Sequence, residues 1–383
     1  MTSKIIYLIV ASLSLIACEP KNKPMKEELA LIIGTYTDGE SKGIYTYRFN
    51  QKSAESTPLS SIESSNPSYL TLSTDNKFVY AVSEHNDGQE EVKAFAFDIE
   101  QGTMQFINSQ AAMGGDPCYI TTNGKYVVTA NYSSGNIATF PIQTDGFLLP
   151  ASDVINFVGS GLDKTRQESA HLHCVQFSPD GKFLFACDLG TDRIYKFNVE
   201  TLADAQNQAK LLEIGTPPAC KVTPGSGPRH LIFAPNGKHA YLINELSGKV
   251  TAFRYSNNGY LTEVQEIPSD SVGARGSADI HISPDGKFLY ASNRLKADGI
   301  AIFSINPKDG KLSEIGYQPT GIHPRNFVLT PNGSYLLVAC RDSNVIEIYK
   351  RDKKSGLLKD TNKRIEISRP VCLKFEHVEQ DQK

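Results

Sequence analysis

The sequence predicts an all-β fold, a seven-bladed β-propeller with four antiparallel strands in each blade. Two observations carry this prediction. One motif recurs along the chain, in which two apolar runs flank a turn of the type Pro/Thr-Asp/Asn-Gly-Lys. The turns lie roughly 50 residues apart, the repeat length of a propeller blade with several strands. Six such turns are centred on Asn76, Gly124, Gly181, Gly237, Gly286 and Gly333.

The seventh copy of the motif is divided between the two ends of the chain. Residues 31–49 read like the second and third strands of a blade, because they match residues 336–350 in pattern. The missing first strand is found at residues 369–375, as R-P-V-C-L-K-F. Pairing this strand with the N-terminal strands would close the ring and cover two open sheet edges. We therefore expect the propeller to occupy residues 29–377, followed by a short tail at 378–383.

A targeting segment precedes the propeller. Lys4 is followed by an apolar and small run at residues 5–17, shorter than the roughly 20 residues that span a membrane. The run ends in Leu-Ile-Ala followed by Cys18, which resembles the lipobox of bacterial lipoproteins. A plain signal peptide or a short anchor is the alternative. We expect residues 1–17 to be a lipoprotein signal peptide, Cys18 to be lipidated, and residues 18–28 to form a tether. The protein would then be exported and anchored to a membrane of the cell envelope, facing the periplasm or the surface.

Composition argues against several other classes of function. The formal net charge is −3 and no basic run is present, so we expect no nucleic-acid partner. The other six cysteines form no Cys-x-x-Cys pair and no Cys/His zinc spacing, so we expect no metal site. A Gly-rich phosphate loop and a Gly-x-Ser-x-Gly elbow are both missing from the sequence. We expect a monomer that needs no cofactor.

Positions at a fixed distance from each turn should be equivalent from blade to blade, once a two-residue gap is allowed in the copy around Gly124. The start of a strand and the end of its antiparallel neighbour lie at the same end of a sheet. Two columns of residues should therefore face one mouth of the ring, and together they hold four Arg, two Glu and one His but no Lys. Arg favours planar recognition of carboxylate or phosphate, which indicates a pocket for an anionic ligand rather than a plain solvated rim. The first column reads Ser68, Cys118, His173, Arg229, Ala278, Arg325 and Val371, and the second reads Tyr36, Glu84, Tyr132, Leu189, Glu245, Arg294 and Arg341.

Four motifs resemble a known family. They are G-P-R-H at residues 227–230, N-E-L at 244–246, D-I-H-I-S-P-D-G at 279–286 and N-Y-S-S-G-N at 131–136. Together they resemble the lactonase family of seven-bladed propellers. That family includes the propeller-type 6-phosphogluconolactonase and, more distantly, the fungal carboxy-cis,cis-muconate lactonizing enzyme. The resemblance implies a small-molecule lactone substrate and a catalytic set of His173, Arg229, Glu245 and Arg294.

Lactone hydrolysis requires an activated water, a stabilised oxyanion and a proton for the leaving alkoxide. His173 suits the role of base, with Glu245 orienting it or the water, and the reverse assignment stays open. Arg229 and Arg294 would polarise the carbonyl group or hold an anionic substituent. We expect further contacts to the substrate from Arg325, Arg341, Tyr132 and Glu84.

The export signal departs from the family pattern, because a phosphorylated gluconolactone is a cytosolic metabolite. The lactone chemistry can carry over while the substrate differs. An alternative function is a non-catalytic surface propeller that binds a sugar acid, a glycan or a protein partner. The matched set of one His, one Glu and two Arg favours the enzyme, since a protein-binding rim would not need it.

Overall fold

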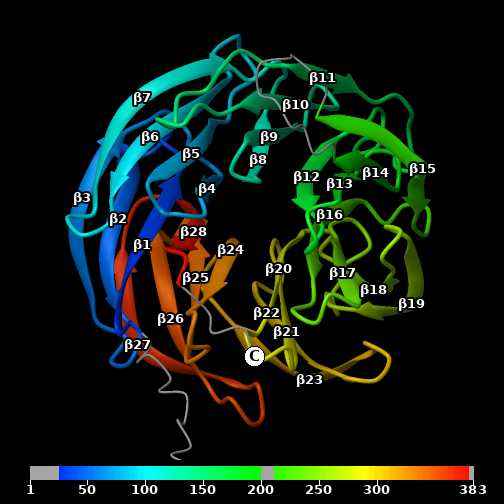
Figure 1. The fold of residues 1–383 in the computed structure, drawn as a ribbon. Coiled ribbons are helices and arrows are strands. Elements are labelled where there is room, and N and C mark those ends of the chain that lie inside the picture. The colour runs from blue at the N-terminus through cyan, green and yellow to red at the C-terminus, as the bar shows by residue number, and fades with distance from the viewer. Residues whose placement is uncertain (1–25, 200–210, 379–383) are drawn as a thin grey trace, which may run out of the picture.

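The computed structural model describes residues 26–199 and 211–378, and these form a ring of seven four-stranded antiparallel sheets (Figure 1). The predicted seven-bladed propeller is confirmed. Cys18, the expected signal peptide at 1–17, most of the tether and residues 379–383 of the tail lie outside the described residues. No helix able to span a bilayer occurs within 26–199 and 211–378.

Each blade runs outward from a strand beside the central channel, except that blade 1 draws its inner strand from the end of the chain. Blade 1 comprises β28 (Pro370–Phe375), β1 (Glu28–Thr35), β2 (Gly43–Asn50) and β3 (Ser56–Glu63). Blade 2 comprises β4 (Leu70–Leu72), β5 (Phe78–Ser83), β6 (Glu91–Asp98) and β7 (Thr103–Ala111). Blade 3 comprises β8 (Pro117–Thr122), β9 (Tyr126–Asn131), β10 (Asn136–Pro141) and β11 (Asp153–Asn156).

The other four blades follow the same order. Blade 4 comprises β12 (Leu172–Phe177), β13 (Phe183–Asp188), β14 (Arg193–Val199) and β15 (Leu212–Lys221). Blade 5 comprises β16 (Pro228–Phe233), β17 (His239–Asn244), β18 (Lys249–Tyr255) and β19 (Leu261–Pro268). Blade 6 comprises β20 (Ser277–Ile282), β21 (Phe288–Asn293), β22 (Gly299–Ile305) and β23 (Leu312–Pro319). Blade 7 comprises β24 (Pro324–Leu329), β25 (Tyr335–Cys340), β26 (Val345–Arg351) and β27 (Leu358–Glu366), with a short 3-10 turn η1 (Arg341–Ser343) before β26.

The C-terminal strand closes the ring as the divided repeat predicted. Strand β28 pairs antiparallel with β1, with Leu31 opposite Phe375 and Ile33 opposite Leu373. The carboxylate of Glu376 then accepts a 2.8 Å hydrogen bond from the backbone N–H of Ala30 and another, 3.1 Å long, from Lys26 Nζ. The chain therefore enters the propeller beside the end of β28. The start of β1 and the end of β28 lie together at one mouth of the channel.

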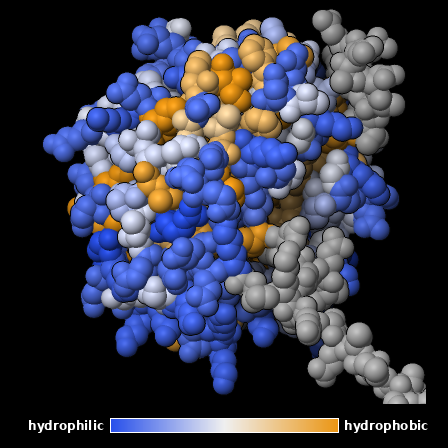
Figure 2. Space-filling model, turned by 60° about the vertical axis from the view of Figure 1, so that its left-hand side comes forward, coloured by the Kyte–Doolittle hydropathy of each residue, from blue (hydrophilic) through white to orange (hydrophobic). Residues whose placement is uncertain are grey.

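Apolar side chains fill the spaces between neighbouring blades, where the two faces of each sheet are buried. Blades 4 and 5 meet through Phe185, Phe233 and Tyr255, whose ring centroids are 4.9 to 6.1 Å apart. Such aromatic packing contributes beyond the area that it buries. The outer surface is largely hydrophilic, with smaller hydrophobic patches, on the face shown in Figure 2.

A repeated hydrogen bond ties adjacent blades near the turns. The hydroxyl of Tyr241 donates to the carbonyl of Gly310 at 2.8 Å, and that of Tyr290 donates to Gly356 at 2.7 Å. Gly356 has a φ of +77°, and a Cβ there would collide with the ring of Phe288. Glycine is needed at this turn both for its backbone conformation and for the close approach of the neighbouring blade.

Candidate active site

The two predicted columns do meet at one mouth of the ring. In blade 5 the N–H of Glu245, just past β17, donates to the carbonyl of Gly227, just before β16, at 2.8 Å. The same backbone bond joins the two columns in five other blades. Its donors and acceptors are Tyr36 and Arg369, Glu84 and Asn66, Tyr132 and Asp116, Leu189 and His171, and Arg341 and His323. The first-column residue follows each acceptor by two positions, so both columns are held at the same level.

A bulge redirects the first-column residue in most inner strands. In β12 the register with β13 shifts between Leu172 and Cys174, so His173 has no partner on the neighbouring strand. Arg229 in β16 and Arg325 in β24 occupy the same position in their bulges. Bulges re-aim single side chains and are common beside active sites. This local irregularity is what turns the predicted residues toward the channel mouth.

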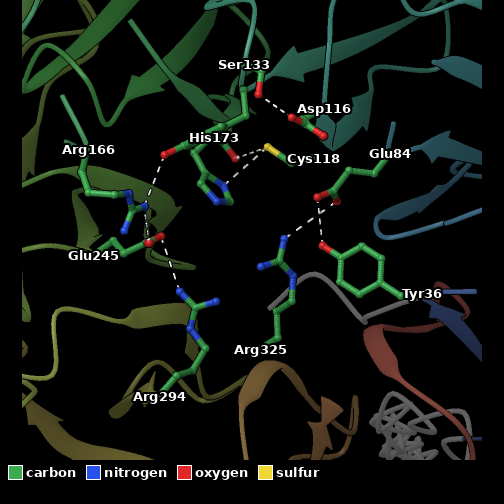
Figure 3. Close-up of a pocket in the computed structure, with 11 residues that line it drawn as sticks. Tyr36, Glu84, Asp116, Cys118, Ser133, Arg166, His173, Glu245, Arg294 and Arg325 are labelled. Carbon is green, nitrogen blue, oxygen red and sulfur yellow. Dashed lines mark hydrogen bonds and ion pairs between the residues drawn. The ribbon is translucent and has the colours of Figure 1, made fainter. Parts of the chain in front are cut away.

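A cavity of about 360 Å³ opens at this mouth. Six residues predicted from the sequence line it: His173, Glu245, Arg294, Arg325, Tyr132 and Glu84. It is completed by Tyr36, Asp116, Cys118, Ser133 and Arg166. Figure 3 shows these side chains converging from several blades on one opening. Arg229 and Arg341 are not part of the lining, and their roles in the reaction stay predictions.

Glu245 is held by three guanidinium groups. Arg229 Nε donates to its Oε2 at 2.9 Å and Arg166 Nη2 donates to its Oε1 at 2.8 Å, while Arg294 Nη2 lies 3.5 Å from Oε2. Burial alone would raise the pKa of Glu245, but Arg294, Arg229 and Arg166 outweigh it and lower the pKa to about 2. The carboxylate is therefore ionised at neutral pH, and it organises the cationic wall of the cavity.

Arg325 presents its guanidinium group to the cavity with few protein partners (Figure 3). Within residues 26–199 and 211–378 it makes no hydrogen bond, and its one ion pair there is 3.8 Å long, to Glu84 Oε2. Its guanidinium carbon lies 5.5 Å from the centre of the Tyr36 ring, and the Tyr36 hydroxyl donates to Glu84 Oε1 at 2.9 Å. Burial would lower the pKa of Arg325, but Tyr36 and Glu84 outweigh it and raise the pKa. A charged guanidinium group whose N–H groups have no hydrogen-bond acceptor among the described residues therefore faces the cavity.

His173 combines burial with a free ring nitrogen. Its Nδ1 lies 3.7 Å from Cys118 Sγ, whereas its Nε2 has no hydrogen-bond partner among the described residues. Burial, followed by the charges of Arg229 and Arg325, lowers the pKa of His173 well below its usual value. The imidazole is therefore neutral at neutral pH and able to accept a proton. His171, the other histidine of the His-Leu-His run, stacks on Tyr132 at 4.5 Å and does not line the cavity.

Arg341 lies behind the lining, near Arg294. It makes two hydrogen bonds to the carboxylate of Asp342, at 2.7 and 2.9 Å, and its Nη2 lies 3.1 Å from His323 Nδ1. The other ring nitrogen of His323 is 3.2 Å from Arg294 Nη1. Arg341 is therefore connected to the cavity lining through His323, which contacts Arg294.

Sequence reasoning missed Arg166 and the pair of Asp116 and Ser133. Arg166 lies in the loop between β11 and β12, where its backbone N–H donates to Asp163 Oδ1 at 3.1 Å. The loop falls in the longest interval between turns, Gly124 to Gly181, and this extra length was the available signal. Asp116 precedes a proline at the start of β8, has a φ of +51° and accepts a hydrogen bond from the Ser133 hydroxyl. The equivalent residues of other blades, Asn66, His323 and Arg369, also have a positive φ, so this conformation belongs to the blade repeat and did not single out Asp116.

No group of three or more His, Cys, Asp or Glu in the described part of the chain is placed to hold a metal ion. The residues that line the cavity supply acids, bases and guanidinium groups. A neutral imidazole, an arginine with free hydrogen-bond donors and an ionised glutamate together suit the addition of water to a polarised carbonyl group.

The chain belongs to the family described as "Lactonase, 7-bladed beta-propeller", which it matches over residues 30–375. The predicted family is confirmed, and with it the class of a lactone-hydrolysing enzyme. A 6-phosphogluconolactonase of Formosa agariphila is 42% identical over 337 residues, which cover 86% of this chain and 94% of that protein.

Solved structures agree with this family. A crystal structure of a Bacteroides fragilis protein is 61% identical, with a TM-score of 0.91, and the match covers 92% of this chain and 99% of that one. The periplasmic gluconolactonase of Pseudomonas aeruginosa is 34% identical, with a TM-score of 0.86 over 92% of this chain and all of that chain (100%).

Proposed function

We propose that the cavity hydrolyses a sugar-derived lactone, as a 6-phosphogluconolactonase-like enzyme. One observation carries this proposal: the guanidinium group of Arg325, which makes no hydrogen bond within the described residues, shares a cavity with the neutral imidazole of His173. The family match and the relatives named as gluconolactonases support a lactone as the substrate.

In the proposed reaction, His173 Nε2 takes a proton from a water as that water attacks the lactone carbonyl carbon. The carbonyl oxygen becomes an oxyanion, which Arg325 and Arg294 stabilise with N–H donors already in place. The tetrahedral intermediate collapses with cleavage of the ring C–O bond, and the His173 imidazolium returns its proton to the leaving alkoxide. The product is a hydroxy acid whose new carboxylate remains paired with the arginines until it leaves.

The ion pairs of Glu245 favour His173 as the base, because both carboxylate oxygens of Glu245 face arginines whereas His173 Nε2 has no hydrogen-bond partner among the described residues. The same ion pairs make Glu245 a good fixed anchor, because it sets the positions of Arg166 and Arg294 on the cavity wall. Glu245 therefore orients the site while His173 moves the proton.

Purified protein tested by pH-stat on a panel of phosphorylated and unphosphorylated sugar lactones decides the proposal. We expect hydrolysis of at least one aldonolactone, and a loss of kcat of about 10²-fold or more in His173→Ala and Arg325→Ala. Cys174→Ser is the matched control, because Cys174 is fully buried beside His173 but does not line the cavity. No hydrolysis of any lactone, together with tight binding of a glycan or protein, would favour the non-catalytic surface propeller.

We further propose that the protein is an exported lipoprotein, lipidated on Cys18. The apolar run at 5–17 and the Leu-Ile-Ala-Cys sequence support this, and one relative is itself described as periplasmic. An enzyme outside the cytosol would meet unphosphorylated aldonolactones more readily than phosphorylated ones. The two arms of the lactone panel separate these substrates.

A further inference from the structure

A buried polar chain runs from the cavity into the centre of the ring. It begins at Arg229, whose side chain is almost completely buried and whose Nε donates to Glu245. Arg229 Nη1 donates to the carbonyl of Ala278 and lies 3.1 Å from His230 Nε2. His230 Nδ1 in turn lies 2.8 Å from Asp279 Oδ1. Every side chain of this series is at least nine-tenths buried.

Asp279 ends the chain and joins three blades. Besides His230 of blade 5, its Oδ2 lies 3.0 Å from His281 Nε2 of its own blade 6. The same oxygen accepts hydrogen bonds from Asn326 Nδ2 at 2.5 Å and from the N–H of Phe327 at 3.2 Å, both in blade 7. Asp279 sits in the bulge of β20, where the register with β21 shifts between Ser277 and Ile280.

Only one arrangement of protons satisfies all these contacts. A guanidinium group can only donate, so His230 Nε2 must carry no proton and accept from Arg229. The proton of the neutral ring is then on Nδ1, where it is donated to the Asp279 carboxylate. Burial and the charge of Arg229 lower the pKa of His230 to about 3, in agreement with a neutral ring. Burial would raise the pKa of Asp279, but its histidine partners lower it, so the carboxylate stays ionised.

We infer that His230 and Asp279 are positioning residues, which fix the Nδ1-protonated form of His230 so that Arg229 is held against Glu245. Neither residue lines the cavity. Their effect reaches it through Glu245, which pairs with Arg166 and Arg294, and through the ring of His230, which packs 5.4 Å from that of His173. The catalytic part of this inference rests on the proposed lactone hydrolysis, whereas the proton arrangement does not.

Asp279→Asn tests this inference with almost no change in shape. An amide has one oxygen and one NH₂ group, so one of its ends must now face a donor. If the NH₂ faces His230, the ring must carry its proton on Nε2, which then opposes the N–H of Arg229. If the NH₂ faces blade 7, it opposes the donors of Asn326 and Phe327. Partners that orient a reacting group are commonly worth about 10- to 100-fold in activity, and we expect a loss of kcat in that range with little change in KM.

Asp285→Asn is the matched control. Asp285 also pairs with a buried arginine, Arg351 Nη2, at 2.9 Å, and it lies outside the cavity lining. It should lower the melting temperature without lowering kcat. His230→Phe keeps a ring of similar size but removes both hydrogen bonds, and it should behave like Asp279→Asn.

Nitrogen NMR of the histidine rings and of the Arg229 side chain gives a readout that mere destabilisation would not move. We expect a neutral, Nδ1-protonated His230 and a slowly exchanging Arg229 Nε–H in the wild type, both kept in Asp285→Asn. In Asp279→Asn the Arg229 signal should be lost, and the proton of His230 should move to Nε2 if the new NH₂ group faces that ring. An Nε2-protonated His230 in the wild type, or a folded Asp279→Asn protein with unchanged kcat and unchanged Arg229 signal, would overturn the inference. If the wild type hydrolyses no lactone, the proposed function fails, and the NMR result alone still decides whether Asp279 positions Arg229.

Discussion

Charge at the cavity is divided between residues with different tasks. Glu245 is held by three arginines, whereas the one ion pair of Arg325 within the described residues is the longer contact to Glu84. The fully paired Glu245 keeps the geometry of the site fixed, and the guanidinium group of Arg325 is free to bind an oxyanion. His173 combines features of both, because its side chain is buried but one ring nitrogen has no hydrogen-bond partner within the described residues. This division follows from which side chains satisfy one another and which do not.

The pH dependence of activity should report His173. A base acts only in its unprotonated form, and the pKa of His173 lies well below the usual value for histidine. We therefore expect kcat/KM to stay on its plateau below pH 6.5, the usual histidine value, and to fall only in more acidic solution. A pH profile from initial rates measures this. An acidic limb with a midpoint at or above 6.5 would contradict the assignment, and His173→Ala should show no such limb.

Acid should destabilise the fold through the same buried histidines. The pKa values of His173 and His230 are lower in the folded chain than in the unfolded one, so below about pH 6.5 the unfolded chain binds more protons. Stability is therefore complete above that pH and is lost as the pH falls toward the folded values. Each histidine contributes a slope of about 1.4 kcal/mol per pH unit. Urea unfolding between pH 5 and 6.5 should show a smaller slope in His230→Phe, and an unchanged slope would argue that His230 is charged in the fold.

At the scale of strands, the sequence predicts the blades well and their irregularities poorly. Alternation and turn residues define strand positions, because burial in every blade imposes the same pattern. The bulges at His173, Arg229 and Arg325 insert one residue without altering the apolar pattern around them, so sequence alone does not reveal them. The two columns nevertheless meet at one mouth in six blades, since a nearly constant count from each turn reaches it, with two residues fewer at Cys118.

Loops outside the repeat escaped prediction for a related reason. Arg166 has no counterpart at the same distance from other turns, and its place is set by contacts that are distant in sequence. The side chain of Gln167, which is fully buried, donates to the carbonyl of Leu189 at 2.8 Å and to Asp192 Oδ1 at 2.9 Å, and this anchors the loop. Arg229 differs from Arg166, because its place in the first column was predicted. Its burial behind Glu245 was not, since this depends on the side-chain packing of two blades.

The last strand should be essential for stability. Deleting residues 369–383 removes β28, which pairs with β1 and buries Cys372 and Leu373. It also removes Phe375, whose ring lies 5.5 Å from Phe49, and large buried side chains of this kind are each worth about 3–5 kcal/mol. We expect a large fall in the melting temperature by calorimetry. A deletion of residues 379–383 alone is the control, and equal melting temperatures for both truncations would refute the closure of the ring.

Considered as a whole, the molecule is one ring whose site needs residues from nearly every blade. The cavity draws on Tyr36 from blade 1, Glu84 from blade 2, and so on to Arg325 in blade 7. A break in the ring should therefore abolish activity together with stability, rather than leaving a partly active fragment. The expected monomer stays a prediction, which light scattering of the purified protein would test.

Cellular location should depend on Cys18. Cys18→Ala should release the protein from the membrane fraction or block its processing, because the lipid would have no attachment point. Fractionation followed by mass spectrometry of the mature N-terminus measures this, and two or more acyl chains are expected, since a single chain holds a protein only marginally. Equal membrane association of the wild type and the variant would exclude the lipobox interpretation. Lactone hydrolysis by the purified variant should be unchanged.

The antiparallel pairing of β1 with β28 also sets the direction in which a tethered molecule would face. Strand β28 starts at the mouth that holds the cavity and ends at the other, where Glu376 holds Lys26 and the chain enters β1. Eight residue steps separate Cys18 from Lys26 and can span at most about 28 Å, so the proposed lipid on Cys18 would keep this end of the ring within that distance of the membrane surface. Attached there, the propeller would stand with the Glu376 end of β28 toward the bilayer and the cavity lined by His173 toward the aqueous space. Lactones would then arrive from solution and hydroxy acids would return to it, without passing between protein and membrane.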